Sequence, residues 1–187
     1  HSGFRDLVGF LLEKGADPNA APAGFTALHE AIMRRDEPLA AALLSHGADP
    51  NAPLRTWTPT RRLSRDWNFE PPLVGATPYW LAARFAQAGM MRLLVKHGAD
   101  PAFVHRAAYH AGDPAEPKRE TVTPVMAALG MGGTVNAWVR PVRREPEPAV
   151  LETVMLAVEL GADVNVANDD SRTALDAASA LKYDQVA

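Results

Sequence analysis

The chain has 187 residues, of which 47% are hydrophobic, and it carries a formal net charge of −3 with a pI of about 6.1. It contains no cysteine, which excludes disulfides and cysteine-based metal sites. No apolar run reaches the roughly 18 residues that a membrane-spanning helix needs. The charge balance also differs from that of the basic domains that bind nucleic acid, so we expect no nucleic-acid partner.

The first predicted element is a helix over residues 4–14. Its apolar side chains recur at helical spacing, at Leu7, Val8, Leu11 and Leu12. Gly15 follows, and glycine is the residue that most often ends a helix in the left-handed conformation. Asp17-Pro18-Asn19 then has the composition of a turn.

Two short motifs recur four times each along the chain. The helix-ending turn, Gly-Ala-Asp, begins at Gly15, Gly47, Gly98 and Gly161. The second motif, a threonine followed by proline or alanine, begins at Thr26, Thr77, Thr123 and Thr173. Threonine caps helix starts and proline is tolerated at the first helical position, so each copy predicts a new helix. The 12 residues from Gly161 to Thr173 and the 21 from Thr26 to Gly47 give a unit of 33 residues.

Residues 26–31, Thr-Ala-Leu-His-Glu-Ala, resemble the Thr-Pro-Leu-His-x-Ala motif of ankyrin repeats, which have the same period. The other three copies differ at the histidine position, where they have Trp80, Met126 and Asp176. The resemblance covers nearly the whole chain outside three breaks in the spacing. It implies an all-α fold, a single ankyrin-repeat solenoid over residues 1–187 with stacked helix pairs and β-turn fingers. It also implies a role in protein–protein binding, with His29 bonded to loop backbone.

Both ends of the array are expected to be part-repeats. Residues 4–14 have the pattern of a second helix without its first, and residues 173–181 that of a first helix without its second. Solenoids cover their terminal faces with capping repeats. We therefore expect the array to continue into further repeats, or to contact other chains, at its ends.

Three insertions interrupt the repeat spacing, at about residues 53–75, 102–122 and 134–149. The first two lie between repeats, at the finger edge, and flank the same repeat, so they should lie side by side. The third lies between the two helices of one repeat, which places it at the opposite edge. Long segments of this kind in a compact domain are usually functional or disordered.

The candidate partner-binding residues are the aromatic and arginine side chains in and beside the finger insertions, because such side chains dominate interface energetics. They are Trp57, Arg61, Arg62, Arg65, Trp67, Phe69, Trp80 and Tyr109. The alternative for Trp80 is that it packs with Tyr79 beneath the first insertion. The insertions carry net charges of +2, 0 and +1 against −6 for the remaining chain, which favours a partner with an acidic surface.

No catalytic, cofactor-binding or metal-binding motif stands out. His105 and His110, with Asp113 and Glu116, are the only metal-like set, but the two histidines lie five residues apart instead of at i, i+4. Gly130-Met131-Gly132-Gly133 follows a helix instead of a strand, which is the wrong context for a dinucleotide-binding loop. We therefore expect no enzyme activity, no cofactor and no metal.

The leading hypothesis is a non-catalytic protein–protein interaction module that binds through the finger insertions and the adjacent repeat face. An alternative is a structural subunit or domain of a larger bacterial assembly, one that could include an enzyme. A third is a ligand or catalytic pocket between the insertions, using His105 or His110 with Arg61 or Arg62. The 15 arginines against 4 lysines are typical of a GC-rich genome. The array resembles bacterial ankyrin proteins, many of them exported, which favours the periplasm or exterior over the cytoplasm.

Overall fold

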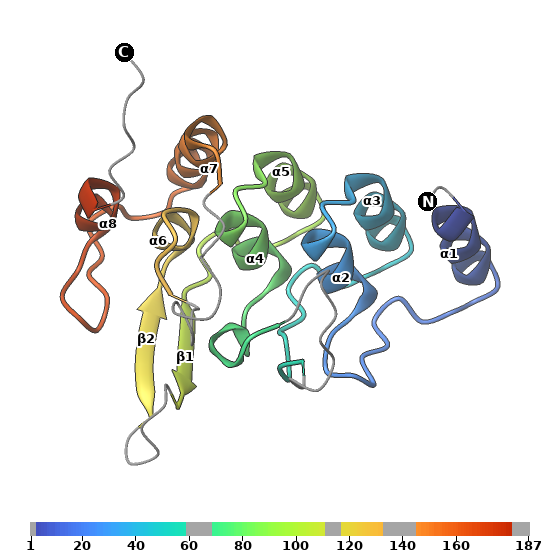
Figure 1. The fold of residues 1–187 in the computed structure, drawn as a ribbon. Helices are drawn as coiled ribbons and strands as arrows, with labels where there is room; N and C mark the ends of the chain where they lie inside the picture. Colours follow the sequence, from blue (N-terminus) through green and yellow to red (C-terminus); the bar gives the residue numbers. More distant parts are fainter. Residues whose placement is uncertain (1–2, 59–68, 111–116, 133–144, 181–187) are drawn as a thin grey trace.

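The computed structural model describes residues 3–58, 69–110, 117–132 and 145–180 (Figure 1). Within these residues the chain forms an elongated array of helices, and a small sheet projects from one edge of the array. The predicted sites Arg61, Arg62, Arg65 and Trp67 lie outside the described residues, as do most of residues 134–149.

The helices stack in two layers (Figure 1). One layer contains α2 (Ala27–Met33), α4 (Pro78–Arg84), α6 (Pro124–Ala128) and α8 (Ala174–Ala180). The other contains α1 (Gly3–Glu13), α3 (Glu37–Ser45), α5 (Ala88–Lys96) and α7 (Glu147–Glu159). Contacts within the pairs α2–α3, α4–α5 and α6–α7, and between successive pairs, give the solenoid of stacked helix pairs that the repeats predict.

The helix boundaries follow from the repeated motifs. The hydroxyls of Thr77 and Thr123 accept hydrogen bonds from the backbone amides three residues on, at 3.4 and 3.3 Å, and a proline follows each threonine. Both features favour a helix start. The glycines of the Gly-Ala-Asp turns have φ between 88° and 94°, so they end helices in the left-handed conformation as predicted.

Residues 102–122 contain a two-stranded antiparallel sheet, which the all-α prediction did not include. Strand β1 (His105–Tyr109) pairs with β2 (Lys118–Val122), and His105 lies opposite Val122. Alternate residues of β1 are buried and exposed, which is the pattern of a strand with one face against the core. A short 3₁₀ helix, η1 (Pro71–Leu73), lies against β1.

The core runs along the array between the two layers and beneath the sheet. In α4 every residue from Pro78 to Ala83 is buried, because neighbouring helices lie on both sides of it. Alanines in this layer, such as Ala31, Ala82 and Ala127, allow the helices to approach closely. No helix in the described part of the chain is long and apolar enough to cross a membrane.

Candidate interaction surface at the finger edge

Asparagine side chains tie successive finger turns together. Nδ2 of Asn19 donates to the carbonyl of Gly47 at 2.9 Å, and its Oδ1 accepts from the amide of Asp49 at 2.7 Å. Asn51 makes the same two bonds to the next copy of the turn, at 2.9 and 2.8 Å. The third copy has Ala102 at this position, which cannot make them. Asparagine hydrogen bonds thus join the first finger turn to the second and the second to the third. The third turn lacks the side chain that would continue the series.

Residues 54–58 run alongside residues 69–76 and form an ordered extension of this edge. Leu54 donates to the carbonyl of Ala76 at 2.9 Å, and Thr58 donates to the carbonyl of Phe69 at 2.9 Å. Leu54 is buried while Arg55 is exposed and Trp57 is 50% exposed. Arg55 and Trp57 alternate with the less exposed Leu54 and Thr56, so both lie on the outer side of this extension.

The extension is seated on the preceding finger at Gly24. The amide of Arg55 donates to the Gly24 carbonyl at 2.8 Å. A Cβ atom at Gly24 would overlap the methyl group of Thr56, and the φ of Gly24 is 86°. Only glycine both lacks a Cβ atom and adopts this positive φ without strain. Gly24 in the preceding finger thus determines the position of the backbone that carries Arg55 and Trp57.

Three predicted partner-binding residues prove to be internal, and their assignment is corrected. Phe69 is 1% exposed and packs against Phe25, with ring centroids 5.2 Å apart. Trp80 is fully buried, and its Nε1 donates to the carbonyl of Val122 at 2.9 Å. Tyr109 is 4% exposed and its hydroxyl donates to Glu120 at 2.7 Å. A partner cannot touch side chains that are already enclosed, so these three residues anchor the finger segments instead.

His105 joins the two neighbouring finger segments. Its Nε2 donates to the carbonyl of Pro72 at 2.8 Å, and its ring lies 4.6 Å from that of Trp80, centroid to centroid. Trp80 therefore packs under the β1–β2 hairpin, whereas the sequence alternative had placed it beneath the first insertion. Burial lowers the pKa of His105, which keeps the ring neutral. Within the described residues no group of three acidic or histidine side chains could hold a metal ion.

His29 has the backbone role that its motif predicts. The Thr26 amide donates to its Nδ1 at 3.2 Å, and the Thr26 hydroxyl lies 2.8 Å from the same nitrogen. Burial lowers the pKa of His29 to about 4, although the nearby carbonyls of Ala76 and Ala52 act in the opposite direction. The neutral imidazole thus holds the backbone at the start of α2.

Arg84, at the end of α4, is a charged residue that the sequence analysis missed. Burial lowers the pKa of its guanidinium, while the carboxylates of Glu70, Glu120 and Glu145 favour the charged form. These carboxylates come from the three segments that were predicted as insertions. All three segments thus contribute negative charge that favours the charged form of Arg84, and no local motif in the sequence signals it.

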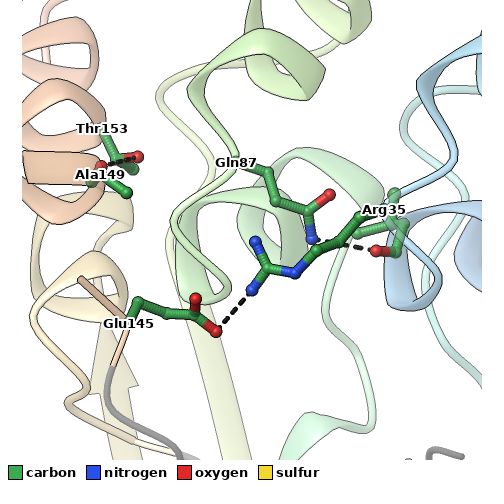
Figure 2. A network of polar contacts seen from close by, with 6 residues as sticks. Arg35, Gln87, Glu145, Ala149 and Thr153 are labelled. Atoms are coloured by element: carbon green, nitrogen blue, oxygen red, sulfur yellow. Dashed lines mark hydrogen bonds and ion pairs between the residues drawn. The ribbon is translucent and has the colours of Figure 1, made fainter.

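Polar contacts connect different helix pairs at the edge formed by the turns between paired helices (Figure 2). Arg35, in the α2–α3 turn, forms an ion pair with Glu145, which lies just before α7. In the turn between α4 and α5, Nε2 of Gln87 donates to the carbonyl of Ile32 at 2.9 Å. The Glu145 side chain is only 14% exposed, so this pair is partly shielded from solvent. It holds the segment before α7 against a turn two helix pairs away.

A family model for the ankyrin repeat matches residues 23–53 and 74–106. The first match covers α2, α3 and the turn that follows, and the second covers α4, α5 and the start of β1. A search of curated proteins found no match. Repeats of this family generally serve as protein–protein interaction modules. Residues 23–53 and 74–106 are therefore ankyrin repeats, and they lie within a longer stack of helix pairs.

Proposed function

We propose that this chain is a non-catalytic protein–protein interaction module whose partner binds the finger edge. The observation that carries the proposal is the exposed pair Arg55 and Trp57 on the ordered extension formed by residues 54–58 and 69–76. Tryptophan and arginine are the side chains that most often dominate protein interfaces. A half-exposed indole held on a bonded backbone loses little conformational freedom when a partner covers it.

The remaining members of the proposed site come from the sequence alone. Arg61, Arg62, Arg65 and Trp67 continue the same segment, outside the described residues. Their composition has the same aromatic and cationic character as Arg55 and Trp57.

The test is a single substitution, Trp57→Ala, measured against a captured partner. The whole chain is used to isolate a partner from lysate and envelope fractions of the source organism, and the affinity is then measured with purified components. Truncating a central aromatic anchor costs 2 kcal/mol or more, so we expect Kd to rise about thirty-fold. Replacing residues 54–74 outright would be a poor test, because that change removes the buried Phe69 and Leu73.

Leu151→Ala is the matched control, because Leu151 is also a large exposed hydrophobic residue but lies on α7. Circular dichroism and thermal unfolding should show that both variants stay folded. A partner that binds the Trp57→Ala variant as tightly as the wild type would contradict the location of the site.

The alternative function, a structural subunit or domain of a larger assembly, is favoured by a different observation. Large apolar side chains are exposed on the outer faces of helices near both ends of the array. They are Leu7, Phe10 and Leu11 on α1, Leu151, Met155 and Val158 on α7, and Leu175 on α8. In a solenoid such faces are covered by further repeats or by another chain. A chain that stays monomeric and soluble at high concentration in sedimentation experiments would count against this alternative.

A further inference from the structure

The two faces of the β1–β2 hairpin have different chemistry. On the inner face His105, Ala107 and Tyr109 are buried against the array. On the outer face Arg106 is exposed on β1 and Arg119 is exposed on β2. Strand alternation makes this division, since successive side chains point to opposite faces.

The strand register brings the two outer arginines together. Arg106 lies opposite Thr121, and Arg119 lies opposite Ala108, so the arginines are diagonal neighbours across the pair. Diagonal neighbours of this kind are about 7–8 Å apart. The small side chains of Ala108 and Thr121 complete the same face and leave both guanidinium groups accessible.

Neither outer arginine is used within the described part of the fold. Lys118, by contrast, pairs with Glu120 at 2.6 Å on the other face, and Tyr109 donates to the same carboxylate. No hydrogen bond or ion pair of the Arg106 or Arg119 side chain occurs among the described residues. Arg55 adds a third exposed arginine on the neighbouring segment, which contacts the hairpin through η1 and His105.

We infer that the outer face of the hairpin binds an acidic segment of a protein partner in an extended conformation. The inference rests on the proposed interaction function and adds the chemistry of the partner. In an extended chain the side chains of residues i and i+2 lie on one face about 7 Å apart, which matches the spacing of Arg106 and Arg119. Arginine accommodates carboxylates well because its planar fork can donate two parallel hydrogen bonds.

An acidic protein segment fits this surface better than a nucleic acid does. Nucleic-acid binding draws its affinity from many phosphate contacts, on the order of six to ten in typical complexes. The outer face of the hairpin and the neighbouring extension offer three exposed arginines, on a chain whose formal net charge is −3. A few carboxylates aligned with the arginines suit this number, whereas a phosphate backbone needs more cationic contacts than these arginines supply.

The experiment uses the whole chain and a fluorescein-labelled Glu-Ser repeat peptide of about ten residues, in which every second side chain is a carboxylate. Its affinity is followed by fluorescence anisotropy at several salt concentrations. We expect salt-dependent binding that weakens about ten-fold in the double variant Arg106→Gln and Arg119→Gln. The control is the double variant Arg92→Gln and Lys96→Gln, which removes two exposed cations from α5 and should bind like the wild type.

Equal affinity of the wild type and the Arg106 and Arg119 double variant would overturn the inference. So would an absence of peptide binding at low salt, or tighter binding of single-stranded DNA with the same number of charges. A partner that loses affinity with Trp57→Ala but binds the double variant normally would leave the interaction module standing and remove the acidic-segment inference alone. If the double variant folds normally but binds that partner more weakly, the result would support both the interaction module and the acidic-segment inference.

Discussion

Replacing Ala102 with asparagine should add the missing link to the row of finger bonds. The Ala102 amide donates to Oδ1 of Asp100 at 2.9 Å, as the Asn19 and Asn51 amides do to their own aspartates at 2.8 Å. The turn at Ala102 therefore has the same local geometry. We expect an asparagine there to bond to the carbonyl of Gly161 and the amide of Asp163, as its two counterparts bond to the equivalent groups of the next turn.

The magnitude follows from the bonds gained and the freedom lost. Each hydrogen bond contributes about 0.5–1.5 kcal/mol net, and ordering the asparagine side chain costs about 1 kcal/mol. Two new bonds thus leave a gain of about 1 kcal/mol in the free energy of unfolding. For a chain of this size that corresponds to a rise in Tm of about 2–4 °C.

Urea unfolding followed by circular dichroism measures this gain as a higher midpoint at constant slope. Asn51→Ala should lower the stability by about 1 kcal/mol, because it removes two bonds that are present. Asn165→Ala is the matched control, since within the described residues its side chain bonds to no further turn, and its effect should stay within about 0.5 kcal/mol. If Ala102→Asn adds no stability while Asn51→Ala lowers it by about 1 kcal/mol, the third and fourth turns are not aligned as the earlier turns are.

Two further substitutions probe the buried polar groups. The folded-state pKa of His29, about 4, lies below its ordinary value of 6.5, so stability is full above about pH 6.5 and falls toward pH 4 as the unfolded chain takes up the proton. The loss of stability is on the order of 3 kcal/mol. In urea titrations His29→Gln should flatten this part of the plot of stability against pH. Parallel plots for the variant and the wild type would contradict the role given to His29. The buried hydroxyl of Tyr79 has no hydrogen-bond partner among the described residues, so Tyr79→Phe should raise the stability by about 1 kcal/mol, and a lower Tm would show that the hydroxyl is satisfied.

The repeated part of the fold could be predicted from the sequence because each motif residue has a local role. Threonine at a helix start and glycine at a helix end act within a few residues, whatever surrounds them. The sequence of the hairpin indicates its strands more weakly. Ala107 and Ala108 occupy opposite faces of β1 but have the same side chain, so polarity does not alternate between them. The strands form because His105 and Tyr109 find distant partners, at Pro72 and Glu120.

The candidate site was predicted only in part, because composition does not determine which aromatic residues stay exposed. Phe69 and Trp57 belong to the same segment, yet Phe69 fits against Phe25 while Trp57 has solvent on one side. Trp80 occupies the histidine position of the repeat motif, which is an inner position. That position was the one available signal that its indole would donate to backbone within the fold, as it does to Val122.

The ion pair between Arg35 and Glu145 affects how the array comes apart. In a simple solenoid each repeat contacts only its neighbours, so the array can lose one repeat at a time from either end. This ion pair bypasses the α4–α5 pair and joins the repeat before it to the repeat after it. Detaching either outer repeat then requires breaking a contact beyond its nearest neighbour. The three repeats should therefore unfold as one cooperative block, with fewer partly unfolded intermediates than a chain of independent pairs would populate.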